Sequence, residues 1–266
     1  MSDIESYFDG KALYGDDFDA AQIAEWFADE QEGFADLGAK DAASYSYGYH
    51  ALNKFHGFSY LPDRQFKQAL GFGSAYGEEL LALKSNIQSA TIVDPSDAFI
   101  RESVYGIPLS YVKPAPDGNL PFPNDTFDLI TCFGVLHHIP NVSSVVSELA
   151  RVLKPDGYIL LREPIVSMGD WRGPRRGLTK RERGIPMQLL DTLFKAHELE
   201  IVKRSLCDFP VTERLFLKLG IYNTYFASLL DAWVSAAFAW NLNYHPRHFI
   251  QRFRARSAFW VLRKPR

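Results

Sequence analysis

Short apolar runs alternate with amphipathic segments from about residue 61 to residue 166. Strands of a parallel sheet, which are buried on both faces, have such runs, and the helices that cover them carry apolar residues at helical spacing. The alternation therefore predicts βαβ units around a parallel sheet. The expected strands are a run that ends at Leu70, residues 90–93, 127–133 and 158–161, and then residues 199–205 and 258–262.

Two amphipathic segments have the pattern of covering helices. In residues 143–153, apolar side chains from Val145 to Leu153 recur at helical spacing. The Lys-Pro-Asp-Gly sequence that follows is a turn signal. Residues 187–196 form the second expected helix, ahead of the next strand.

Composition divides the chain into four zones. We expect an N-terminal helical cap in residues 1–60, a core in residues 61–207, an aromatic-rich helical lid insertion in residues 208–256 and the last core strand in residues 257–266. A chain of 266 residues is long enough for one domain with such additions. The expected fold class is α/β, with a doubly wound, mostly parallel sheet.

Charge and cysteine content narrow the function classes. The formal net charge of −3 argues against a general nucleic-acid-binding protein, so no nucleic-acid partner is expected. Cys132 and Cys207 are too few for a disulfide framework or a multi-thiolate metal site, and no metal is expected. The polar start lacks the pattern of a signal peptide, and no apolar stretch is long enough for a transmembrane segment. The sequence therefore favours a cytoplasmic protein.

A glycine-rich turn follows the first expected strand. Gly71, Gly73 and Gly77 precede residues 78–83, which have the composition of a helix start. Such a turn lets the backbone approach a ligand closely and directs helix N–H groups at it. Asp94 ends the next apolar run, and a carboxylate there can accept hydrogen bonds from both hydroxyls of a ribose. On these residues alone, a dinucleotide site fits about as well, and a tight turn with a capping Asp is the structural alternative.

Three downstream motifs resemble one family in order and spacing. They are Leu-Pro-Phe-Pro-Asn-Asp-Thr-Phe-Asp from residue 120, Val-Leu-His-His-Ile-Pro from residue 135 and Glu-Leu-Ala-Arg-Val-Leu-Lys-Pro-Asp-Gly from residue 148. With the glycine turn, they closely resemble the methyltransferase type 11 group of class I methyltransferases. The resemblance implies a Rossmann-like, seven-stranded sheet with a reversed last strand. It also implies that S-adenosylmethionine lies across the carboxyl ends of the strands.

The resemblance assigns cofactor-binding positions as well. The matching residues are Gly71, Gly73 and Ala75 beside the methionine portion, Asp94 and Pro95 at the ribose, Asp117 near the adenine amino group, and Cys132 and Phe133 beside the sulfonium. Two positions depart from the family pattern. Ala75 replaces a glycine, which is a small change. Ala69 stands where the family usually has an acid, and this removes a usual polar anchor for the methionine amino group.

Candidate catalytic residues follow two of the expected core strands, residues 127–133 and 158–161. A hydroxyl acceptor must lose a proton during methyl transfer, and a His near its ordinary pKa suits that role. His137 and His138 follow the strand expected at residues 127–133, and Glu163 follows the strand expected at residues 158–161. Some glycoside O-methyltransferases of this family look similar, so the resemblance implies a His base assisted by an acid. In other relatives a His at this place only hydrogen-bonds the loop.

The loop of residues 167–186 is rich in charge, glycine and proline, and it lies where an acceptor should enter. Arg offers bidentate donors to carboxylate or phosphate, and Trp offers a flat face for a sugar. The candidate acceptor-binding residues are Asp170, Trp171, Arg172 and Arg175, with His245 from the insertion. A solvated loop with ordinary ion pairs is the alternative.

Large apolar side chains of the insertion, from Phe226 to Trp240, recur on one helical face. Such a stripe is more often core or homodimer packing than a ligand site. Beside a basic end, it would instead suit contact with a lipid-linked substrate at a membrane surface.

Together these residues favour S-adenosylmethionine-dependent O-methylation of a small-molecule hydroxyl. The expected acceptor is a saccharide or other small molecule that carries an anionic group, such as phosphate, or a lipid. A nicotinamide-dependent oxidoreductase would use the same glycine turn, but no Tyr-x-x-x-Lys pair stands where hydride transfer needs it. A partner-binding protein that keeps the fold without the cofactor is the third interpretation, and Ala69 supports it.

Overall fold

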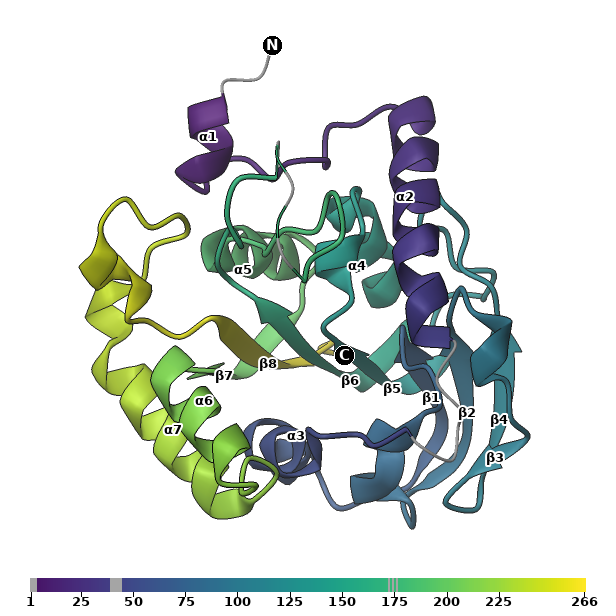
Figure 1. The fold of residues 1–266 in the computed structure, drawn as a ribbon. Helices are drawn as coiled ribbons and strands as arrows, with labels where there is room; N and C mark the ends of the chain where they lie inside the picture. Colours follow the sequence, from purple (N-terminus) through teal and green to yellow (C-terminus); the bar gives the residue numbers. More distant parts are fainter. Residues whose placement is uncertain (1–3, 39–44, 172, 174, 176) are drawn as a thin grey trace.

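The computed structural model describes residues 4–38, 45–171, 173, 175 and 177–266, with the backbone alone for residues 31–38. An eight-stranded sheet in the order β3-β4-β2-β1-β5-β6-β8-β7 forms its centre (Figure 1). The strands are β1 Phe66–Phe72, β2 Ile87–Val93, β3 Ser103–Val104, β4 Ile107–Val112, β5 Phe127–Phe133, β6 Leu153–Pro164, β7 Glu200–Cys207 and β8 Ser257–Arg263.

The sheet has the expected α/β topology with a reversed last strand. The pairs β1–β2, β1–β5, β2–β4 and β5–β6 are parallel, whereas β8 runs antiparallel to both β6 and β7. Because β1 lies between β2 and β5, the strand order reverses there. Open α/β sheets bind ligands beside such a reversal, at the carboxyl ends of the strands.

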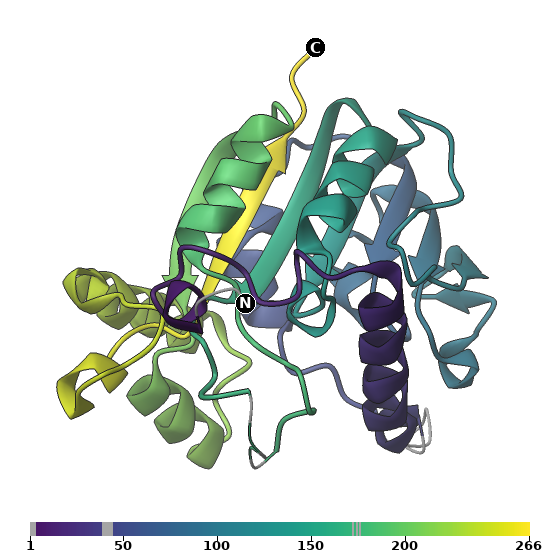
Figure 2. The same ribbon diagram turned by 90° about the horizontal axis from the view of Figure 1, so that it is seen from above.

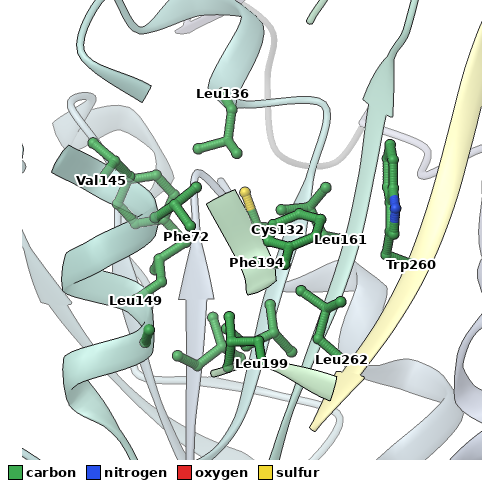
Figure 3. Packing of buried hydrophobic residues seen from close by; sticks show 14 of the residues in the cluster. Phe72, Cys132, Leu136, Val145, Leu149, Leu161, Phe194, Leu199, Trp260 and Leu262 are labelled. Atoms are coloured by element: carbon green, nitrogen blue, oxygen red, sulfur yellow. The ribbon is translucent and has the colours of Figure 1, made fainter. Parts of the chain in front are cut away.

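Helices cover both faces of the sheet. α4 and α5 lie over one face (Figure 2), and their apolar side chains form a buried cluster with the strands (Figure 3). α3 and the 3-10 helix η2 contribute to a second cluster on the other face. The α-helices are α1 Ile4–Phe8, α2 Ala20–Gly38, α3 His50–His56, α4 Val142–Val152, α5 Met187–Ala196, α6 Pro210–Lys218 and α7 Tyr225–Ala237.

Three elements differ from the sequence-based expectation. β4 and the short β3 were not expected, because Pro108 and polar residues interrupt the apolar run near this edge. The helical segment expected after the glycine turn is present with the expected bounds, as the 3-10 helix η2 Glu78–Leu83. β6 begins already at Leu153, so the expected turn at residues 154–157 lies inside a strand, with Asp156 at a φ of +60°.

The N-terminal segment joins the core through α2, which stands above the carboxyl ends of the central strands (Figure 1). Trp26 is fully buried, and its Nε1 donates a 2.8 Å hydrogen bond to the carbonyl of His138. α6 and α7 of the insertion lie at the β7 end of the sheet. Among the described residues, no helix is both long and apolar enough to cross a membrane.

Candidate active site

The carboxyl ends of β1 and β2 border a cavity of about 290 Å³. β1 runs into the glycine turn, where Gly73 has a φ of +67°, and Asp94 follows β2. The buried Asp94 carboxylate accepts hydrogen bonds from the backbone N–H groups of Ala75 and Ser96, both at 3.0 Å. Burial raises the pKa of Asp94, although these hydrogen bonds oppose the shift. Asp94 therefore fixes the glycine turn and also faces the cavity.

The walls of this first cavity fit an adenosine-containing group. Its lining includes the apolar residues Pro95, Phe99, Leu120 and Ile139, together with Phe27 and Glu30 of α2. A carboxylate beside an apolar slot is what a ribose and a purine require. Gly73 is needed for packing too, because an added Cβ would lie 2.5 Å from a methyl group of Val135. The residues present therefore fit the ribose and purine of S-adenosylmethionine.

A second cavity of about 590 Å³ lies beside the carboxyl ends of β5 and β6. Its lining includes Tyr49, Phe133, His137, Arg162, Glu163, Asp208, Glu213 and Arg256. Gly134 lines both cavities and has a φ of +73°. An added Cβ there would contact only Cε1 of His137, at 3.6 Å. The two cavities thus meet at a residue without a side chain.

Glu163 holds the turn that follows β5. Its fully buried carboxylate accepts hydrogen bonds from the backbone N–H groups of Val135 and Leu136, each at 2.8 Å. The other oxygen lies 2.8 Å from Nδ1 of His137. A carboxylate with several N–H donors fixes both the backbone and the imidazole. Glu163 is therefore a positioning residue for His137.

His137 lies between two carboxylates, because its Nε2 is 3.5 Å from Glu182 Oε1. Burial disfavours the imidazolium, but hydrogen bonds with Glu163 and Glu182 outweigh it and raise the pKa of His137 to about 9. Burial likewise opposes the Glu182 carboxylate, but the hydrogen bond with His137 and the charge of His138 lower the pKa of Glu182 to about 2. His137 is accordingly charged at neutral pH and must lose a proton before it can act as a base.

His138 faces the first cavity, and its Nδ1 lies 2.9 Å from Glu30 Oε2. Burial and the charge of His137 lower the pKa of His138, which favours its neutral form at neutral pH. The ligand atoms of His137, His138 and Glu182 lie within 4.8 Å of one another, a spacing that a metal ion would accept. Both ring nitrogens of His137 already face carboxylates, however, and the imidazolium form cannot ligate a metal.

Comparison with known families decides what this core is. Residues 70–161 match the family model of a methyltransferase domain. This segment is a methyltransferase type 11 domain. The uncharacterized methyltransferase YcgJ of Bacillus subtilis is 35% identical over 101 residues, which are 35% of this chain and 39% of YcgJ. The ubiquinone biosynthesis O-methyltransferase of Shewanella pealeana is 30% identical over 98 residues, 35% of this chain and 42% of that protein. The chain thus spans about two fifths of the length of these relatives.

Solved structures extend the likeness of fold beyond the methyltransferase domain. A chain of the complex between the Haloferax volcanii Trm112 methyltransferase activator and a methyltransferase has a TM-score of 0.58 at 15% identity, covering 88% of this chain and 97% of that one. Phosphoethanolamine N-methyltransferase 1 of Haemonchus contortus, solved with phosphoethanolamine and S-adenosylhomocysteine, has the same TM-score at 15% identity. That alignment covers 96% of this chain and 51% of the other.

The predicted cofactor positions of the methyltransferase domain divide between cavity and core. Those in the lining of the first cavity are Gly73, Ala75, Asp94 and Pro95. Phe133 lines the second cavity, whereas Cys132 points into the core among the side chains of Figure 3 and lines neither. The Cys132 side chain is fully buried, whereas Gly134, two residues later, lines both cavities.

Two more predicted cofactor positions, Asp117 and Gly71, contact neighbouring residues of their own turns and do not line the first cavity. Asp117 is exposed, and its carboxylate accepts hydrogen bonds from the backbone N–H of Asn119 at 3.0 Å and from its amide at 2.5 Å. Gly118 and Asn119, not Asp117, line the cavity. At Gly71, an added Cβ would lie 2.6 Å from the hydroxyl of Ser74, so this glycine shapes the turn from behind.

The predicted acceptor loop packs against the N-terminal cap. Arg172 lies outside the described residues, and Asp170 is half-buried. Trp171 is buried, with its ring centre 4.8 Å from that of Phe8 and 5.1 Å from that of Tyr14. The His245 ring centre lies 4.4 Å from that of Phe8, and its Nδ1 lies 2.8 Å from the Ser167 hydroxyl. None of the described predicted acceptor residues lines either cavity.

Four cations in the described part of this loop have partners within the protein. Arg175 donates hydrogen bonds to the carbonyl of Thr179 at 3.1 Å and to that of Glu182. Arg183 is fully buried, and its guanidinium donates to carbonyls of the turn after β5, including that of Ile139 at 2.9 Å. Lys180 and Arg181 pair with Asp29 of α2 and Arg181 also with Glu25. The described part of this loop therefore links α2 to the turn that follows β5.

Sequence reasoning missed two charged groups at the site. Arg162 is 8% exposed and lines the second cavity. Its guanidinium stacks on Tyr49 at 3.9 Å and reaches Asn53 Oδ1 only at 3.5 Å. Glu79 is buried beside the glycine turn and accepts a 3.2 Å hydrogen bond from Thr131. Arg162 ends an apolar run next to Glu163, which is the one sequence signal that pointed to it.

Proposed function

We propose that this protein is an S-adenosylmethionine-dependent methyltransferase that acts on a small-molecule acceptor. One observation carries the proposal: the cavity that holds Asp94 meets the cavity that holds His137 at Gly134. The methyltransferase domain and the S-adenosylhomocysteine held by a structural neighbour support the choice of cofactor.

S-Adenosylmethionine would supply an electrophilic methyl group and leave as a neutral thioether. The acceptor's nucleophile forms a bond to the methyl carbon as the carbon–sulfur bond breaks, and its proton passes to a base. Asp94 would accept hydrogen bonds from the ribose hydroxyls, with the apolar walls around the purine. Gly134 leaves the nucleophile free to approach in line, and such alignment supplies much of the rate.

Glu79 is our candidate for the polar anchor that Ala69 lacks. Ala69 is fully buried on β1, and Glu79 reaches the same region from η2, next to Thr131 of β5. Burial raises the pKa of Glu79 to about 7, although hydrogen bonds with Ser74 and Thr131 oppose the shift. A bound ammonium group would compensate the buried carboxylate.

We propose His137 as the base for a hydroxyl acceptor, with Glu163 as its positioning residue. His137 lines the second cavity 3.6 Å from the place that a Gly134 side chain would take. The name of the Shewanella relative, an O-methyltransferase, is consistent with oxygen as the nucleophile. A saccharide acceptor stays a prediction from sequence, and the stacking face assigned to it, Trp171, is buried against the cap.

Calorimetric titration with S-adenosylhomocysteine and with NADPH tests the proposal. We expect micromolar binding of S-adenosylhomocysteine, because Asp94 and the apolar slot are preformed, and no binding of the nicotinamide nucleotide. Preferential binding of NADPH would favour an oxidoreductase. Binding of neither ligand would favour a cofactor-free protein. Proteins of similar fold include one with a different activity, the [4+2]-cyclase SpnF, which has a TM-score of 0.53 at 16% identity, covering 92% of this chain.

The second cavity predicts how acceptors are recognised. Arg162 presents a guanidinium with few partners, so we propose that it binds an anionic or carbonyl oxygen of the acceptor. The Arg162→Met variant should raise the Michaelis constant for the acceptor by about 10- to 100-fold, the range for a lost charge-assisted hydrogen bond, and leave cofactor affinity near normal. Steady-state kinetics with each substrate varied would measure this.

Arg175→Ala is the matched comparison, because Arg175 belongs to the loop first predicted to capture the acceptor. Its guanidinium is engaged by backbone carbonyls, so we expect a smaller change in the acceptor's Michaelis constant. A larger increase in the acceptor's Michaelis constant for Arg175→Ala than for Arg162→Met would indicate that the loop, not the second cavity, binds the acceptor.

A further inference from the structure

Large apolar side chains are exposed mainly on the insertion. Of the seventeen that are exposed among the described residues, eleven lie between residues 211 and 250. They are Val211, Leu215, Leu217, Leu219, Tyr225, Phe226, Leu230, Trp233, Trp240, Phe249 and Ile250. Single exposed apolar residues need no explanation, but such a concentration marks an interaction surface. We call these eleven residues the apolar surface.

α7 turns its large side chains outward and its small and polar ones inward. Phe226, Leu230 and Trp233 are exposed, Trp233 to 73%, whereas Asp231 and Ser235 are buried. A helix of a water-soluble protein normally shows the reverse. The orientation is fixed from within, because the Asp231 carboxylate accepts hydrogen bonds from backbone N–H groups at the start of α6 and from a threonine hydroxyl. The hydrogen bonds of Asp231 thus hold α7 with its aromatic face toward solvent.

Positive charge accompanies the apolar surface. Residues 208–256 contain six Lys or Arg against three Asp or Glu, a net of +3 in a chain whose net charge is −3. None of the three acids is exposed: Asp208 binds Tyr222, Glu213 pairs with Arg256, and Asp231 is buried.

Exposed cations stand among these apolar side chains. Arg214 and Lys218 share α6 with Leu215, and Arg252 follows Ile250. In the described part of the chain, no carboxylate lies within ion-pair distance of Arg214, Lys218 or Arg252. Exposed aromatic and aliphatic side chains with interspersed cations, and no exposed acid, are the pattern of a surface that binds anionic lipid. A second copy of the same surface would bring like charges together, which disfavours self-association through it.

We propose that the apolar surface and its cations dock this protein on a bilayer that contains anionic phospholipid. Aromatic side chains would enter the interface between headgroups and acyl chains, and Arg214, Lys218 and Arg252 would meet the phosphates. The inner side of the same insertion lines the second cavity with Asp208 and Glu213, so docking would bring that cavity close to the membrane surface.

Tryptophan fluorescence tests this docking, because the five tryptophans divide cleanly. Trp26, Trp171 and Trp260 are buried, whereas Trp233 and Trp240 are exposed on the insertion, to 73% and 74%. Adding vesicles of phosphatidylglycerol and phosphatidylcholine should shift the emission to shorter wavelength, and brominated lipid should quench it. Vesicles of phosphatidylcholine alone should give little change, and added salt should weaken the effect because headgroup charge is screened.

Co-sedimentation of the Trp233→Ser/Trp240→Ser variant with the same vesicles gives the second measurement. We expect at least about a tenfold loss of binding, because two interfacial anchors are removed. Both side chains are exposed, so the circular dichroism spectrum of this variant should match that of the parent. The Arg214→Gln/Lys218→Gln variant tests the contribution of charge without changing any apolar residue. No cofactor or acceptor is needed, so the result is independent of the proposed methyl transfer.

Two outcomes would overturn the proposal. One is the absence of any emission shift or sedimentation with anionic vesicles. The other is a stable dimer in light scattering that the Trp233→Ser/Trp240→Ser variant dissociates, since the apolar surface would then be covered by a second copy.

Discussion

The His137→Gln variant is expected to lose about 10²- to 10⁴-fold of its methyl-transfer turnover on a hydroxyl acceptor, the range for removal of a general base. The pKa of His137, about 9, sets the direction of the pH dependence. Below that pH the imidazole carries the proton that a base must lack, so kcat/KM of the parent protein should rise with pH and level off above about 9. A pH–rate profile of parent and variant measures both effects.

Glu163→Gln and the cofactor provide the controls for this prediction. Replacing the carboxylate by an amide removes a charge that stabilises the imidazolium, so the rising limb of the profile should move to lower pH. S-Adenosylhomocysteine should bind His137→Gln almost as tightly as the parent, since His137 lies in the second cavity. Full turnover of His137→Gln with an unchanged profile would exclude His137 as the base.

The Asp94→Ala variant should bind S-adenosylhomocysteine at least about a hundredfold more weakly than the parent. Two hydrogen bonds to ribose hydroxyls are lost, each worth about 1.5–3 kcal/mol, and the glycine turn loses the acceptor for the backbone N–H of Ala75. Isothermal titration would measure the loss, and Asp94→Asn would separate the charge from the shape of the side chain.

Asp117→Ala is the natural comparison, because the sequence also placed an acid of the cofactor site there. Asp117 is exposed and its carboxylate is occupied by Asn119, so we expect a much smaller loss of affinity. Equal losses at Asp94 and Asp117 would show that the adenine reaches Asp117 after all. An unchanged affinity in Asp94→Ala would contradict the assignment of the first cavity.

Periodicity alone could predict the central strands and the covering helices, because both faces of the sheet are buried and the helices alternate apolar and polar faces. α5 begins and ends where its pattern predicts, at Met187 and Ala196. β4 escaped prediction because it lies near the edge, where Pro108 and polar residues are tolerated. Edge strands need no continuous apolar run.

The candidate site was predictable where a motif fixes the backbone and much less so where partners come from afar in the sequence. Asp94 and Gly73 take their places from the strand–turn geometry. The charge of His137 depends on Glu182, 45 residues later in the chain, and no local pattern brings those two together. For the same reason, the loop cations looked available for an acceptor until Asp29 of α2 was placed beside them.

Gly134 also bears on how a protein with this fold could evolve a different activity. The first and second cavities meet at a position that carries no side chain, so a single substitution that places a large side chain there should separate them. The partitioned protein would still recognise the nucleotide with Asp94 and its neighbours, yet the transferable carbon could no longer reach the second chamber. A lineage could therefore retain the nucleotide as a fixed structural component while the second chamber came under selection for a different reaction.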